Sequence, residues 1–360
     1  MAIYKNFNIV DESSPESGDV VSNVKDIVSS GMWADGSTSI TAFFTSSTQS
    51  GSTGDFFLDV YSANPQSDST SKPQFSIAYA NFNGSGSLGA VGVNGNRAAA
   101  GIYRQLSNTL LGPDSDQFTF AGSAAGSGGN LTKLSPDYVY AISISRRQLR
   151  EKMDPGNWEL VLSGSGALLG ANNKIKLIDD SGATTNPSVQ KGGRVFNVVS
   201  GSIASGTAVT KTTAAAQPGG AYGLFYPDLG IIILNGPILN ASASLSTNTT
   251  SNDLGGNNDK LFQRISDGAK FQARREEVIT SQHYFCRVPN KEFNFSSNPT
   301  FVSGSAGNFQ QATFFKNPKS FITQVGLYNN ANELLAVAKL SKPLLKSYSR
   351  EAIIKVKLDF

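Results

Sequence analysis

The most reactive side chains of this sequence are its one histidine, His283, and its one cysteine, Cys286. An imidazole beside a thiol can form the nucleophile pair of a cysteine hydrolase. The two residues stand three positions apart in a predicted strand over 277–288, and alternate residues of a strand point to opposite faces. The spacing therefore predicts two packing residues and no catalytic pair.

The same two residues exclude other chemistries. Zinc sites built from several His and Cys ligands need more of them than the chain has, and one cysteine cannot close an intrachain disulfide. A Ser-His-Asp triad could use only His283. We therefore expect no bound metal and infer no oxidising compartment.

Paired carboxylates could hydrolyse glycosides, because that reaction needs two acids flanking a sugar cleft. The neighbouring acids are Glu276 and Glu277, Asp179 and Asp180, and Glu151 with Asp154. Such neighbours are common on exposed turns, and no repeated β-helix period accompanies them. We expect no enzyme and no catalytic residue, and a glycan-degrading enzyme ranks last among the alternatives.

Glycines at 84, 86 and 89 have the spacing of a dinucleotide-binding fingerprint and follow a predicted strand over 75–82. No helix opens at the third glycine, and no acid on a strand follows about 20 residues later. Walker A and Gly-x-Ser-x-Gly sequences do not occur. The segment predicts an ordinary glycine-rich loop, and we expect no cofactor.

The composition and net charge argue against nucleic-acid and membrane partners. The chain has 360 residues, 36 of them glycine, and only 16% are charged, against roughly 25% in an average soluble protein. A net charge of +3 is too small to indicate a nucleic-acid or membrane partner. No secretory leader or membrane span is recognisable. We expect a soluble chain made in the cytoplasm.

The predicted elements indicate a mainly β protein with a few short helices, a β-rich α+β fold. Segments rich in β-branched and aromatic residues, such as 40–45, 55–61 and 138–144, predict antiparallel sheets in sandwich-like modules. Apolar residues at three- and four-residue spacing predict a helix near 98–111, and a capping serine predicts a basic helix near 146–153.

The predicted organisation has three parts. Residues 1–30 form an N-terminal arm, and 31–220 form a β-rich domain that contains both helices. Residues 221–360 form a second β-rich region, which ends in a C-terminal β meander over 316–360.

The last 45 residues carry a local excess of positive charge over the acids Glu333, Glu351 and Asp359. Lys355 and Lys357 alternate with apolar residues, which is typical of the solvated face of an edge strand. The alternative is docking onto an acidic partner protein, steered by opposite charge. With aromatic anchors added, the candidate interaction surface is Lys342, Lys346, Arg350, Lys355, Lys357, Phe225 and Tyr226.

Five segments carry a resemblance to a known group: residues 321–329, 333–341, 354–360, 102–111 and 152–160. They resemble virion structural proteins of large contractile-tailed phages, with the cyanophage-type myoviruses as the nearest match. The resemblance implies a tail or baseplate component that assembles through protein contacts.

We therefore expect a non-enzymatic structural subunit of a contractile phage tail, positioned in the baseplate. Its partners would be other virion proteins, in homo- or hetero-oligomers, and it would be assembled in the host cytoplasm and reside in the virion tail. The C-terminal module would dock on one subunit while the arm reaches a second. Alternatives are a tail-fibre or receptor-binding protein that recognises host glycan, for example through the loop 242–258, and a neck or capsid-associated protein.

Overall fold

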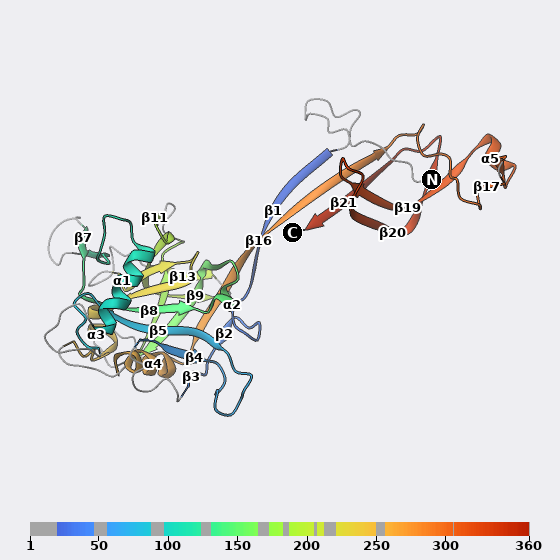
Figure 1. Ribbon diagram of the computed structural model, residues 1–360. Helices are drawn as coiled ribbons and strands as arrows, with labels where there is room; N and C mark the ends of the chain where they lie inside the picture. Colours follow the sequence, from blue (N-terminus) through green and yellow to red (C-terminus); the bar gives the residue numbers. More distant parts are fainter. Residues whose placement is uncertain are drawn as a thin grey trace. The chain divides into compact units, whose positions relative to one another are not determined.

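The chain is described here by a computed structural model, which divides it into two compact units. We call Val28–Glu277 the sheet unit, and Met1–Ile27 together with Val278–Phe360 the hairpin unit. Two strands run from one unit into the other, β1 (Val20–Gly31) and β16 (Phe271–Val288) (Figure 1). The structure describes residues 20–46, 56–87, 97–123, 131–164, 173–182, 187–204, 207–211, 221–249, 256–304 and 306–359.

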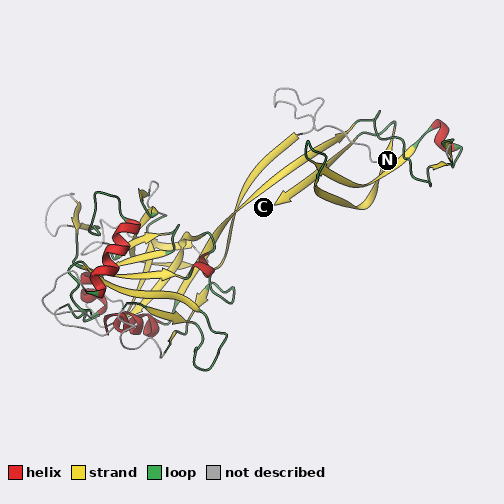
Figure 2. Cartoon of the chain, in the orientation of Figure 1, coloured by secondary structure: helices red, strands yellow, loops and turns green. Residues whose placement is uncertain are grey.

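The sheet unit is built on one large antiparallel sheet (Figure 2), so the expected mainly β fold with a few short helices is confirmed. Its strands pair in the order β16-β9-β10-β12-β14-β15-β8-β5-β4-β3, and β2 also pairs with β16. The bounds are β2 (Ser39–Ile40), β3 (Phe44–Thr45), β4 (Leu58–Tyr61), β5 (Pro73–Asn81), β8 (Tyr138–Ile144), β9 (Lys152–Ser163), β10 (Lys174–Asp179), β12 (Gly193–Ala204), β14 (Gly223–Tyr226) and β15 (Ile231–Asn235).

Shorter strands complete this unit. β11 (Ser188–Gln190) and β13 (Thr207–Lys211) both pair with β12. A separate hairpin consists of β6 (Phe120–Ser123) and β7 (Leu131–Leu134).

The core of the sheet unit lies on both faces of the sheet, because successive side chains of a strand point in opposite directions. In β8, Tyr140 and Ile142 belong to one buried cluster, whereas Val139 and Ala141 belong to the other. Helices contribute to both clusters. Those helices are α1 (Ala98–Leu110) on the Val139 side, and α3 (Gly236–Ala243) and α4 (Gly256–Gly268) on the Tyr140 side.

The helix predicted near 98–111 is confirmed as α1, but the one predicted at 146–153 is too long. The observed α2 (Arg146–Leu149) has four residues. It ends because Arg150 adopts a φ of 54°, in the left-handed region, and β9 begins two residues later. Between Met153 and Trp158 the strand bulges at the Pro155-Gly156 turn, where its register with β16 shifts.

The predicted domain boundary at residue 220 differs from the structure. β14 pairs with β12, and β15 pairs with β8, so residues on both sides of 220 build one sheet. Hydrogen bonding between strands distant in sequence therefore holds together what composition had suggested was two regions. Of the predicted arm, residues 20–30 belong to β1, and residues 1–19 lie outside the described part of the chain.

The hairpin unit contains the antiparallel pair β19 (Lys319–Tyr328) and β20 (Leu334–Ser347). The predicted meander over 316–360 is wrong in its last step, because β21 (Ala352–Asp359) pairs with residues 281–288 of β16. Three short elements precede the hairpin: β17 (Val302–Ser303), β18 (Asn308–Phe309) and α5 (Thr313–Lys316).

Candidate assembly surface

The hairpin unit exposes apolar side chains that a folded monomer normally buries. Among the described residues, 16 large hydrophobic side chains are exposed, and 12 of them belong to this unit. They are Val24, Ile27, Phe295, Phe309, Phe315, Phe321, Tyr328, Leu334, Leu335, Val337, Tyr348 and Ile353. Its buried hydrophobic residues are only Val288, Phe301, Ile354 and Val356 within the described ranges.

The β19–β20 hairpin is apolar on both faces toward its tip. Val325 and Leu327 lie opposite Ala338 and Ala336. The Tyr328 ring lies over Gly326 of the same strand. A Cβ atom built on Gly326 would lie 2.9 Å from a carbon of the Tyr328 ring. An aromatic ring that covers a strand glycine stabilises the strand but leaves its outer surface apolar.

Proline divides this hairpin into a tip and a base. The register shifts where Lys342 and Pro343 stand in β20, and proline has no N–H to donate to the neighbouring strand. Below the shift, Phe321 pairs with Leu345 and is 61% exposed. A groove beside α5 is lined by Phe314 and Phe321 together with lysines. The exposed apolar surface therefore extends from the tip to the base.

Aromatic rings pack together in the segment that precedes the β19–β20 hairpin. Phe301 is buried and stacks on Phe314, with ring centroids 4.8 Å apart. Phe295 and Phe309 contact Phe301 edge-on, at 5.6 and 5.8 Å. Such edge contacts are favourable beyond simple burial. Phe295 and Phe309 nevertheless remain exposed on their outer sides.

The predicted interaction residues separate into two groups. Lys342, Arg350, Lys355 and Lys357 are exposed in the hairpin unit. On β21 the two lysines alternate with buried Ile354 and Val356, as the sequence predicted. Lys355 lies over the Phe285 ring at 5.6 Å, and Lys357 contacts Asp359 at 3.0 Å.

The other three predicted surface residues are corrections. Phe225 and Tyr226 are fully buried in the two core clusters of the sheet unit, because β14 is a central strand covered on both faces. Lys346 is also fully buried, and its Nζ donates to Asn290 O and Asn294 Oδ1 at 3.0 Å and to Ser347 O at 3.1 Å. Burial lowers the pKa of Lys346. These residues support the fold and are not available to a partner.

His283 and Cys286 occupy β16 opposite Lys357 and Ile354 respectively. The imidazole stacks on the Phe285 ring, with centroids 6.4 Å apart. The two side chains therefore take opposite faces of the strand, as predicted from their spacing. Within the described ranges, no group of three or more His, Cys, Asp or Glu residues is placed to hold a metal ion.

The neighbouring acids considered for glycoside hydrolysis accept hydrogen bonds or form ion pairs within the fold. Asp179 accepts hydrogen bonds from the backbone N–H groups of Gly156 and Ser181 at 2.8 and 2.9 Å. Burial raises the pKa of Asp179 in spite of these donors. Asp180 accepts from the backbone and side chain of Asn197.

The remaining acids form ion pairs or hydrogen bonds of the same kind. Glu276 pairs with Lys152 at 2.8 Å, and Glu277 pairs with both Arg150 and Arg275. Asp154 accepts from Ser29 Oγ at 2.7 Å. The structure brings together no pair of acids that flank an open cleft among these candidates.

Residues of the glycine-rich segment and of the segment 242–258 make hydrogen bonds that stabilise the fold. Gly84 and Gly86 have φ of 78° and 77°, and Ser87 Oγ accepts from the backbone N–H of Ala99 at 3.0 Å, capping α1. Of the segment 242–258 considered for glycan, residues 250–255 lie outside the described part of the chain, and Asn257 and Asn258 belong to α4. Asn257 donates to Gly86 O, and Asn258 accepts from the backbone N–H of Tyr79. Both asparagines are buried, so their amides are occupied internally.

No protein-family model, curated protein or solved structure matches this chain. None of the helices in the described residues is long and apolar enough to cross a membrane.

Proposed function

We propose that this chain is a non-enzymatic structural subunit of a contractile phage tail, positioned in the baseplate, and that it assembles through its hairpin unit. The observation that carries the proposal is the concentration of exposed apolar side chains on a unit with almost no buried core among its described residues. Exposed apolar side chains on a monomer are ordinarily scattered singly, and their concentration on one unit is typical of a protein interaction site.

Burial of the exposed apolar side chains at a subunit contact would stabilise the assembly. Phe321, Leu335 and Ile353 are 61, 67 and 66% exposed. Full burial of one such side chain contributes about 1.5–3 kcal/mol. Contact with neighbouring subunits would recover that energy and supply the core that the hairpin unit lacks.

Sequence resemblance supports the same part of the molecule. Three of the five segments that resemble phage virion proteins coincide with β19, β20 and β21. The exposed Lys342 and Arg350 lie in the same unit, and they would steer an acidic partner toward it.

Assembly is tested by replacing three apolar side chains at once, in the variant Phe321→Ser, Leu335→Ser and Ile353→Ser. The matched control is Val189→Ser, because Val189 is 76% exposed but belongs to the sheet unit. We expect the triple variant to fall at least about a hundredfold in incorporation into particles, since several apolar contacts are lost. Normal incorporation of the triple variant would overturn the proposed role of the hairpin unit.

Position is tested by gold-labelled antibody against the chain on intact particles before and after contraction. Label at the tail end supports the baseplate. Label along projecting fibres, or at the neck or head, would contradict the baseplate position and indicate those positions instead. Unlabelled particles would overturn the assignment to the virion.

A further inference from the structure

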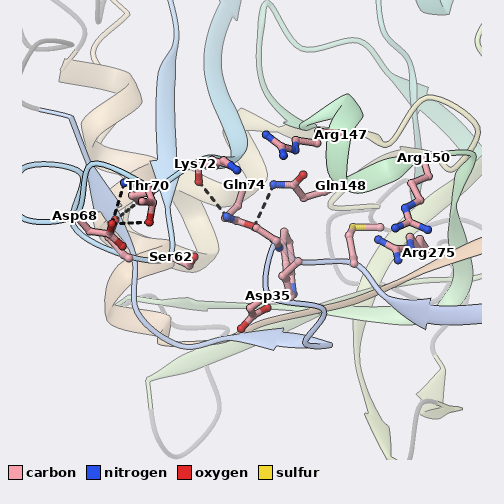
Figure 3. Close-up of a pocket in the computed structure, with 15 residues that line it drawn as sticks. Asp35, Ser62, Asp68, Thr70, Lys72, Gln74, Arg147, Gln148, Arg150 and Arg275 are labelled. Atoms are coloured by element: carbon pink, nitrogen blue, oxygen red, sulfur yellow. Dashed lines mark hydrogen bonds between the residues drawn. The ribbon is translucent and has the colours of Figure 1, made fainter.

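A polar pocket lies in the sheet unit, and all of its lining residues belong to that unit. Its volume is about 370 Å³, at the lower end of the range for small-molecule sites, about 300–1,000 Å³. The walls come from the segment 32–35, the β4–β5 loop, α2 and Arg275 of β16. Figure 3 shows the polar side chains of these segments gathered around one opening.

Two glutamines are fixed at the pocket. Gln74 and Gln148 are 1 and 3% exposed. Gln74 Oε1 accepts from Ala34 N at 3.0 Å, and its Nε2 donates to Lys72 O at 2.9 Å, so both ends of this amide are oriented. Gln148 Nε2 donates to Pro73 O at 3.1 Å. Its carbonyl end points away from Gln74 (Figure 3) and can accept a hydrogen bond.

The cations of the pocket differ in what they contact. Arg150 and Arg275 both pair with Glu277, at 3.2 and 2.9 Å. Lys72 and Arg147 are exposed and form no ion pair with any residue that the structure describes. Both line the pocket and flank the two glutamines (Figure 3). These two cations are therefore available to an anionic group.

Two carboxylates complete the lining. Asp35 Oδ1 accepts from Ser37 N, and Asp68 Oδ1 accepts from Thr70 N and Thr70 Oγ1. Hydrogen bonds from these side chains and backbone groups lower the pKa of both carboxyls, so both are ionised at neutral pH. A carboxylate has about four acceptor sites, so each can accept further hydroxyl groups.

We propose that this pocket binds an acidic saccharide, with its carboxylate on Lys72 and Arg147 and its hydroxyls on Asp35, Asp68 and Gln148. The lining contains both cations and carboxylates, and this combination favours a sugar acid. A bare inorganic anion would offer the two carboxylates few hydroxyl groups, and a neutral sugar would leave the two cations without an anionic partner. A sugar acid satisfies both, because it carries one anionic group and several hydroxyls. This inference is independent of the assembly surface and goes beyond the proposed structural role.

The test is titration of the full chain with digalacturonic acid, a hyaluronan tetrasaccharide and sialyllactose, each against its neutral counterpart. Arg147→Gln should weaken binding of the acidic probe at least tenfold, because a charge-assisted hydrogen bond is lost. The matched control is Arg146→Gln, since Arg146 is the exposed neighbour in α2 and does not line the pocket. It should leave affinity unchanged.

A second variant examines the hydroxyl side of the pocket. Asp68→Asn should weaken both acidic and neutral probes, whereas Arg147→Gln should affect only the acidic ones. Equal loss in Arg146→Gln and Arg147→Gln would overturn the proposal, as would inorganic phosphate binding as tightly as the sugar acids. The absence of saturable binding of all three acidic probes up to roughly 10 mM, about 3 kcal/mol of binding energy, would overturn it as well.

Discussion

The two units of this protein differ in how much of their apolar side-chain surface they bury. The sheet unit covers both faces of its sheet and holds every buried hydrophobic cluster identified among the described residues. The hairpin unit extends strands whose side chains stay largely exposed. The first unit therefore has the buried core that a stable domain needs, whereas the second has almost none among its described residues, and we propose that neighbouring subunits complete it.

Two lysines repeat this contrast on a smaller scale. Lys270 in the sheet unit pairs at 2.9 Å with Glu159, whose side chain is fully buried. Lys346 in the hairpin unit is fully buried but donates to three uncharged oxygen acceptors. Lys270 neutralises the buried Glu159 carboxylate, whereas Lys346 connects β20 by hydrogen bonds to the loop that contains Asn290 and Asn294.

The largest effect is expected from a matched pair of phenylalanines. Phe75→Ala should destabilise the sheet unit by about 3–5 kcal/mol, because Phe75 is fully buried and packs on Trp33, Phe43 and Phe271. Phe321→Ala should change unfolding by less than about 0.5 kcal/mol while weakening association. Tryptophan fluorescence in urea reports the sheet unit, since both tryptophans lie there.

Association in this pair is followed by hydrogen exchange of β19 and β20 at increasing chain concentration. In the unaltered chain the protection of these strands should rise with concentration, and Phe321→Ala should reduce the rise. A loss of several kcal/mol in the Phe321 variant at low concentration would contradict the comparison, because the hairpin unit would then have a core of its own.

A middle-sized effect is expected at the buried ion pair. Lys270→Met should cost about 3 kcal/mol, because Glu159 would remain buried without its cation, although Ile203 N still donates to it. The double variant with Glu159→Gln should recover part of the loss. Urea denaturation of both variants measures this, and equal stability of the single and double variants would show that the charge is not the cause.

The smallest effect is expected from Lys346→Met, about 1 kcal/mol, because lost hydrogen bonds are partly offset by removal of a buried charge. Burial holds the pKa of Lys346 below its ordinary 10.5. Between the two values the unfolded chain binds more protons, so stability contributed by this group rises with pH.

Circular dichroism of urea unfolding from pH 7 to 11 should show that rise in the unaltered chain and its loss in Lys346→Met. Lys342→Met is the control, since Lys342 stands on the same strand but is exposed. Identical pH profiles of the unaltered chain and Lys346→Met would contradict the assignment.

Local pattern was sufficient for much of the secondary structure. The spacing of Ile102, Tyr103, Leu106 and Leu110 predicted α1, and alternation predicted the exposed lysines of β21. Such patterns are readable because a helix or strand repeats its own geometry over a few residues. The assignment to a phage tail stays a prediction, since it depends on resemblance and on partners.

Sequence patterns alone determined that this chain is β-rich, that α1 is a helix and that His283 and Cys286 face apart. Only the tertiary structure decided that Phe225 and Tyr226 are core, that Lys346 is buried, and that the unit boundary crosses the middle of β16. It alone placed Lys72, Gln74, Arg147 and Gln148 around one pocket. The physical reason is that burial and convergence depend on contacts between distant segments, which no local periodicity encodes.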